Sequence, residues 1–210
     1  VPVDPNAELA GVYRYIGAGG TVMRPTKIGP AMIFNNVIGH EDSRTLIGLL
    51  SSRERVGLML DCKPERLGFL LNDAVKAPID PIVVQHEAAP CQEVVHYSTE
   101  EGFDIRKLIP APTNTPEDAG PYITMGMCYA SDPETGESDV TIHRLCLQSK
   151  DEISMYFVPG ARHLEVFRQK AELLSKPLPI SISIGVDPAI EIAACFEPPT
   201  TPIGFDELSI

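Results

Sequence analysis

The sequence predicts an α+β protein in which a small α/β domain precedes a barrel-like, antiparallel β domain. Helix and strand patterns are mixed in the first half of the chain, whereas strand patterns joined by turn sequences dominate the second half. A proline-rich stretch at 108–112 and a polar run at 113–118 separate the two halves. Because such stretches interrupt regular structure, we expect domains at residues 1–107 and 108–210.

Two helices and two strands are expected in the first half. The Asp-Pro pair at 4–5 is typical of a helix start, and a short amphipathic pattern follows it. Apolar runs at 31–34 and 45–50 are typical of short buried strands. Pro64 is expected to begin a helix with one apolar face, which ends before Pro78.

The second half is expected to form one antiparallel β domain. Its predicted strands lie at residues 122–130, 140–147, 153–158 and 180–186. The first two are joined by the turn sequence Asp-Pro-Glu-Thr-Gly at 132–136. A helix over 161–176 is expected to pack on the strands through Leu164, Phe167, Ala171 and Leu174. Asp187 followed by a proline predicts the start of another helix.

Composition excludes several classes of function. The net charge of −12 disfavours a nucleic-acid partner, which needs a clustered basic surface. No run approaches the roughly 20 apolar residues of a membrane span. The five cysteines show no C-x-x-C spacing, which is typical of reduced thiols in a cytoplasmic protein. The first residue is Val1 and no terminating signal follows Ile210, so we expect a part of a longer protein.

The predicted strand around residues 139–144 is unusually polar. Strand alternation places Asp139, Thr141 and His143 on one face and Arg144 on the other. Periodicity alone is more typical of a half-exposed strand with a solvated polar face. The strand is therefore a candidate binding element whose function the pattern leaves open.

The turn at 159–163 is a second candidate, because it precedes a predicted helix. The N-terminus of a helix can bind phosphate, and Arg162 would add a charged donor there. A tight turn with surface side chains is the alternative. Asp139, His163 and Glu207 together offer the oxygen and nitrogen ligands that suit octahedral Mn²⁺ or Mg²⁺. Spacing alone does not establish this site, since an acidic residue in a loop is usually just solvated.

Several sequence stretches, in family order, resemble the UbiD-like family of prenylated-FMN-dependent decarboxylases. They lie at residues 34–39, 110–112, 118–124, 132–136, 141–144, 162–163 and 177–189. Two more, at 9–21 and 196–202, are similar to bacterial gallate and protocatechuate (3,4-dihydroxybenzoate) decarboxylases. The resemblance implies an N-terminal α/β domain followed by an FMN-binding split β-barrel that is incomplete at its C-terminal end.

The resemblance also implies roles for individual residues. Contacts to prenylated FMN are assigned to Thr141, Ile142, His143, Arg144, Arg162 and His163. Asp139, His163 and Glu207 are assigned as ligands of Mn²⁺ (or Mg²⁺) against the cofactor phosphate, with K⁺ nearby. Asp139 stands where the family usually has asparagine. Arg144 matches the arginine of a catalytic Glu-Arg-Glu network whose two glutamates are expected beyond residue 210.

The activity implied is the non-oxidative decarboxylation of a hydroxylated aromatic acid of the gallate or 3,4-dihydroxybenzoate type, through a covalent adduct with prenylated FMN. We expect the complete protein to be a homo-oligomer that receives its cofactor from a flavin prenyltransferase, and this chain alone to be inactive. Two alternatives stay open. One is a non-catalytic flavin-binding split-barrel module, and the other is a decarboxylase of the same family that acts on a polyprenylated hydroxybenzoate.

Overall fold

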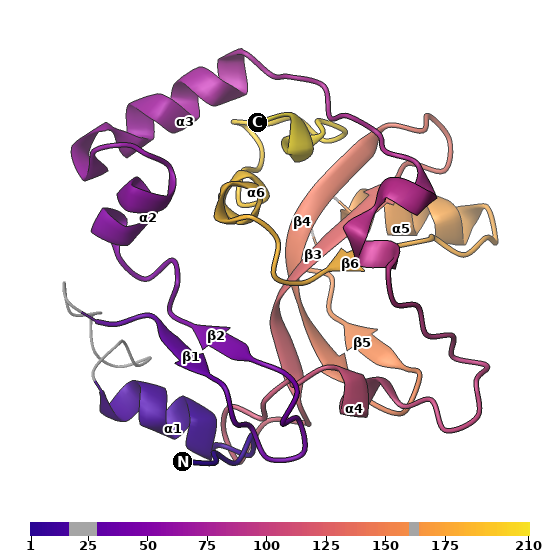
Figure 1. Ribbon diagram of the computed structural model, residues 1–210. Coiled ribbons are helices and arrows are strands. Elements are labelled where there is room, and N and C mark those ends of the chain that lie inside the picture. Colours follow the sequence, from indigo (N-terminus) through magenta and orange to yellow (C-terminus); the bar gives the residue numbers. More distant parts are fainter. Residues whose placement is uncertain (17–28, 160–163) are drawn as a thin grey trace. The chain divides into compact units, whose positions relative to one another are not determined.

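The computed structural model describes residues 1–16, 29–159 and 164–210 of the chain. It mixes helices and strands, as the α+β prediction requires (Figure 1). The chain forms two compact units. The first contains Val1–Ser51, Pro81–Ile123 and Cys146–Ser154, and the second contains Ser52–Asp80, Thr124–Leu145 and Met155–Ile210. The domain division expected between residues 107 and 108 stays a prediction.

Helix α1 (Glu8–Tyr15) and the antiparallel strands β1 (Met32–Phe34) and β2 (Thr45–Ile47) belong to the first unit. Their core consists of the buried residues Val3, Leu9 and Val37 and the partly buried Val12, Phe34 and Ile47. The helix begins three residues later than the Asp-Pro pair predicts, after Ala7. The expectation of buried strands is wrong, because a two-stranded sheet leaves the alternate residues Ile33 and Leu46 58% and 46% exposed.

Helices α2 (Arg53–Met59) and α3 (Leu67–Lys76) belong to the second unit. The sequence did not predict α2, which Ser52 caps by accepting a hydrogen bond from the backbone N–H of Arg55. Pro64 starts a 3₁₀ turn, Pro64–Arg66, that leads into α3 as expected. The α3 face is less buried than predicted, since Leu67 is its buried residue.

A four-stranded sheet has the order β5-β4-β3-β6. Its strands are β3 (Tyr122–Ser131), β4 (Ser138–Leu147), β5 (Ile153–Met155) and β6 (Ser181–Ser183). Strand β6 pairs antiparallel with β3, which agrees with the predicted antiparallel domain. A tight turn joins β3 to β4, where the N–H of Asp132 donates to the carbonyl of Glu137 at 2.8 Å. Strands β5 and β6 are shorter than the patterns at 153–158 and 180–186 predict.

Helix α5 (Leu164–Leu173) buries Leu164, Phe167 and Ala171, as its apolar spacing predicts. Leu174 was wrongly included in this stripe, since it follows the helix and is 40% exposed. Helix α6 (Pro188–Ala193) begins as predicted, with the carboxylate of Asp187 accepting from the N–H of Ala189 at 2.8 Å. A core cluster joins β3, β4 and α6 through Met127, Val140, Ala194, Tyr129, Ile142, Val186 and Ile190.

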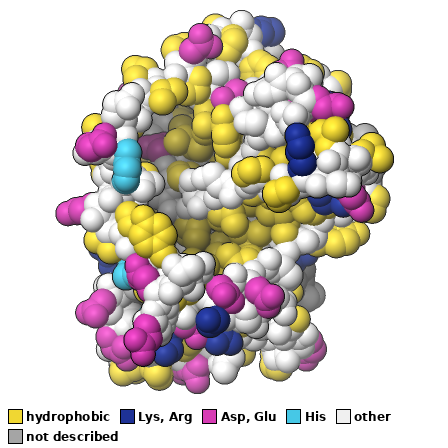
Figure 2. Space-filling model, turned by 90° about the vertical axis from the view of Figure 1, so that its right-hand side faces the viewer, with side chains coloured by type: hydrophobic (Ala, Val, Ile, Leu, Met, Phe, Trp, Pro, Cys, Tyr) yellow, Lys and Arg dark blue, Asp and Glu magenta, His cyan; other side chains and the backbone are white. Residues whose placement is uncertain are grey.

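Several short elements complete the described part of the fold. They are α4 (Ile105–Leu108) and the 3₁₀ turns His86–Ala88, Pro90–Gln92 and Glu207–Ser209. Among the described residues, no helix is both long and apolar enough to cross a membrane. Acidic side chains are spread over the face shown in Figure 2, in keeping with the net charge of −12.

Candidate functional site

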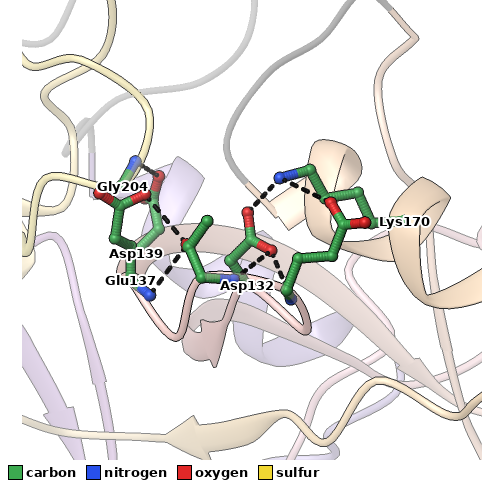
Figure 3. A network of polar contacts seen from close by, with 7 residues as sticks. Asp132, Glu137, Asp139, Lys170 and Gly204 are labelled. Atoms are coloured by element: carbon green, nitrogen blue, oxygen red, sulfur yellow. Dashed lines mark hydrogen bonds and ion pairs between the residues drawn. The ribbon is translucent and has the colours of Figure 1, made fainter.

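Two carboxylates, Asp139 and Glu207, are buried in the second unit, with side chains that solvent scarcely reaches. Asp139 lies near the start of β4, and its Oδ2 accepts from the N–H of Gly204 at 3.3 Å (Figure 3). Glu207 opens the last 3₁₀ turn, and its Oε2 accepts from the N–H of Val140 at 3.3 Å. The loop around 202–207 is therefore fastened to the first residues of β4.

The pair is electrostatically unfavourable as it stands. Burial and, second, the charge of Asp139 raise the pKa of Glu207 to about 7. Among the described parts of the chain, its buried Oε1 forms no hydrogen bond of ordinary geometry, while the nearby Thr201 side chain acts to lower the pKa of Glu207. A divalent cation would use this oxygen and offset the repulsion between the two carboxylates, so the donor set fits a hard metal ion. The third predicted ligand, His163, lies outside the described residues.

The position of Glu207 depends on a glycine. Gly204 adopts φ of +83°, and a Cβ there would lie 3.1 Å from Oε2 of Glu137. Any other residue would therefore be strained by its backbone conformation and crowded by a neighbouring side chain. Gly204 brings the loop close enough for its N–H to reach Asp139.

A separate ion pair holds the turn between β3 and β4. Asp132 accepts from the N–H groups of Glu134 and Thr135 and pairs with Lys170 of α5 (Figure 3). Burial acts to raise the pKa of Asp132, but these partners outweigh it and the pKa is lowered. Helix α5 is thereby fixed to the turn that precedes Asp139.

A pocket of about 310 Å³ opens in the same unit. Its walls are Thr141, Ile142, His143, Phe157, Val158, Glu165, Ala194, Cys195, Phe196 and Glu197. Three of the predicted cofactor residues, on β4, thus lie on the wall of one pocket, two residues along the strand from Asp139. Their contact with a cofactor stays a prediction.

The remaining predicted residues are not part of that wall. Arg144 is exposed, and its position on the other face of β4 from Asp139 stays a prediction. Its catalytic role stays a prediction. Arg162, like His163, lies outside the described residues, so the predicted phosphate-binding turn cannot be placed.

Sequence reasoning missed the rest of the wall, of which Glu165 is the most informative residue. Arg168 forms a two-pronged ion pair with it and holds the pKa of Glu165 below its ordinary value. The spacing of three residues on a predicted helix is a signal for this pair. Phe157 follows β5, where the strand pattern gave no sign of a pocket.

Two family models match most of the chain. The model of the 3-octaprenyl-4-hydroxybenzoate carboxy-lyase Rift-related domain matches residues 82–210, and that of the N-terminal domain matches residues 1–75. The chain therefore belongs to the UbiD family. It is 57% identical over 210 residues to a gallate decarboxylase of Lactiplantibacillus plantarum, spanning all of this chain and 43% of that protein.

Solved structures show the same relationship. The apo structure of a 3,4-dihydroxybenzoic acid decarboxylase from Enterobacter cloacae matches with a TM-score of 0.90 and 60% identity, over 100% of this chain and 43% of that one. A UbiD-class enzyme from Pelotomaculum thermopropionicum, in complex with prFMN, matches with a TM-score of 0.86 and 33% identity, over 100% and 44%. The chain thus spans less than half the length of these relatives.

Proposed function

We propose that this chain is the part of an aromatic acid decarboxylase that holds prenylated FMN and a divalent metal ion. The observation that carries the proposal is the buried pair Asp139 and Glu207. Asp139 lies on β4, the strand that also contributes Thr141, Ile142 and His143 to the wall of the pocket. Identity of 57% to a gallate decarboxylase supports gallate or 3,4-dihydroxybenzoate as the substrate type. The reaction would release CO₂ without net oxidation.

A divalent metal ion would offset the negative charge of the cofactor phosphate. Asp139, Glu207 and His163 would hold Mn²⁺ (or Mg²⁺), with K⁺ bound nearby. The described pocket wall contains no Lys or Arg side chain, and of its two carboxylates, Glu165 and Glu197, the first is already paired with Arg168. A phosphate beside such a wall requires a cation to offset its charge, and the acidic pair would bind that cation.

The pocket would receive the cofactor within a split β-barrel formed around β3 and β4. Thr141, Ile142 and His143 would lie along the cofactor, while Phe157 and Phe196 would keep water away from it. When bound, prenylated FMN supplies the sink for the electron pair left by the departing CO₂. Arg144 is exposed and is not part of the described pocket wall, but it directly follows His143 of that wall, and its planar guanidinium can hold a carboxylate, which would orient the substrate acid.

The wider organisation follows from the family resemblance and from the chain's share of its relatives' length. We infer a flavin-binding domain over residues 108–210 after an N-terminal domain over 1–107. Further residues of the complete protein would supply the two glutamates of the catalytic network. We also infer a homo-oligomer in the cytoplasm that receives its cofactor from a flavin prenyltransferase.

The proposal is tested by assaying CO₂ release in the complete decarboxylase that contains this chain. Gallate, 3,4-dihydroxybenzoate and a polyprenylated hydroxybenzoate are compared, and bound flavin is measured from its absorbance in the same samples. Asp139→Ala is expected to lose both flavin and turnover, whereas Glu117→Ala, which removes an exposed carboxylate, keeps both. Flavin bound without CO₂ release from any of the three acids would favour a non-catalytic flavin-binding module instead.

A further inference from the structure

The wall of the pocket contains a carboxylate whose charge opposes the proposed ligand. Glu165 lies in the first turn of α5, and its side chain is only 8% exposed. Flavin mononucleotide is an anion because of its phosphate. A buried, uncompensated carboxylate beside it would weaken binding through desolvation and repulsion. Something in the structure must therefore neutralise Glu165.

Arg168, one turn further along α5, provides that neutralisation. Its Nε donates to Oε2 of Glu165 at 2.6 Å, and its Nη2 donates to Oε1 at 2.9 Å. The side-chain amide of Gln169 also donates to Oε1, at 2.9 Å. Both oxygens of Glu165 are thus occupied from the helix side. A two-pronged contact of this kind fixes orientation as well as charge.

The same guanidinium also contacts the aromatic part of the wall. Its central carbon lies 5.7 Å from the centroid of the Phe157 ring, within the range of a cation–π interaction. The Phe157 ring in turn lies 5.3 Å from the ring of His143, at an interplanar angle of 57°. Phe157 and His143 both line the pocket, whereas Arg168 does not. Arg168 therefore acts on the pocket through its neighbours.

We propose that Arg168 is a positioning residue of the flavin pocket, which neutralises Glu165 and holds the Phe157 ring so that the wall accepts an anionic aromatic ligand. This inference rests on the proposed function, because it takes FMN as the occupant of the pocket. The remaining guanidinium nitrogen of Arg168, Nη1, donates to Oε2 of the exposed Glu172 at 2.8 Å. That contact faces solvent and is not required for the proposed role.

The test measures the affinity of FMN for the complete decarboxylase by quenching of flavin fluorescence, which needs no turnover. Arg168→Ala is expected to weaken FMN binding at least about tenfold. Adding Glu165→Gln to Arg168→Ala removes the uncompensated charge and is expected to recover most of the loss. Glu172→Gln breaks the solvent-facing contact of the same guanidinium and serves as the matched control, with unchanged affinity.

Each outcome decides the inference. Failure of the unaltered protein to bind FMN would overturn the proposed function and this inference with it. Normal affinity in Arg168→Ala would overturn the inference alone. An equal loss in the single and double variants would also overturn it, because a purely structural role of Arg168 gives no recovery from Glu165→Gln. If Arg168→Ala does not fold, Arg168→Gln, which removes the charge and keeps a polar side chain, takes its place and is judged by the same recovery.

Discussion

Buried carboxylates occur in two different settings in the second unit. Asp132 and Glu165 each contact a cation on α5, Lys170 and Arg168 respectively, and in both the pKa is lowered. Glu207 instead is buried beside the charge of Asp139, and first burial and then that charge raise its pKa to about 7. The first two acids therefore stabilise the fold in their ionised form. Ionisation of Glu207 destabilises the metal-free protein, which agrees with its proposed role as a metal ligand.

The largest effect that separates the two settings is the pH dependence of stability. The folded-state pKa of Glu207 is about 7 and its ordinary value is 4.5, so the folded protein retains a proton that the unfolded chain releases between these values. Metal-free protein should therefore lose stability as pH rises from about 4.5 to 7, by on the order of 3 kcal/mol. Urea unfolding across this pH range measures the loss.

Glu207→Gln is the control for this prediction. It should flatten the profile over the same range, although Glu191, whose pKa burial also raises, would still contribute. In the unaltered protein, added Mn²⁺ should increase stability near pH 7, because a bound cation favours the ionised form of Glu207 in the folded state. A metal-free profile that rises between these pH values would show that Glu207 is not held protonated.

Removal of a cation-paired acid should destabilise the protein at neutral pH by a smaller amount. Asp132→Ala leaves two backbone N–H groups without their acceptor and leaves the partly buried Lys170 paired with the more exposed Glu134. We expect a loss of about 2 kcal/mol in the free energy of unfolding, allowing for the solvent exposure of Lys170. Glu134→Ala, which removes the exposed second partner of Lys170, should cost less than about 1 kcal/mol. Equal losses of stability in Asp132→Ala and Glu134→Ala would mean that burial of Asp132 does not increase its contribution to the free energy of unfolding.

Gly204 should link stability to metal binding. Gly204→Ala forces a Cβ into a left-handed conformation and against Glu137, so we expect a loss of about 1 kcal/mol together with weaker Mn²⁺ binding. Gly136→Ala is the matched control, since Gly136 also has a positive φ, of +79°, but its Cβ would meet nothing within 4 Å. A similar loss of Mn²⁺ affinity in both variants would show that the 202–207 loop has no specific part in metal binding.

The elements predicted well from the sequence are those fixed by local chemistry. The β3–β4 hairpin follows from two long strand patterns around Asp-Pro-Glu-Thr-Gly, and α6 begins where Asp187 caps it. Strand length was overestimated for β5 and β6, because a strand extends only as far as its partner pairs with it. The patterns could not show which neighbouring strand ends first.

Only part of the candidate site was predicted, because its residues are brought together by contacts between distant parts of the sequence. Asp139 and Glu207 were proposed as partners from the family resemblance, and their approach depends on a loop contact between residues 65 positions apart, Asp139 and Gly204. No local pattern encodes such a contact. The spacing of Glu165 and Arg168 could have indicated an ion pair. That the pair borders a pocket depends on the packing of α5, which spacing does not report.

The central claim is that Asp139 and Glu207 bind a metal ion while Asp132 and Glu165 do not. It is tested most directly by measuring manganese in the complete decarboxylase after reconstitution with Mn²⁺ and flavin, by elemental analysis. The unaltered protein should retain about one manganese per chain. Almost no manganese should remain in Asp139→Ala and Glu207→Ala. The control Glu165→Gln, which alters the acid paired with Arg168, should retain the full amount. Undiminished manganese in both Asp139→Ala and Glu207→Ala would contradict the account.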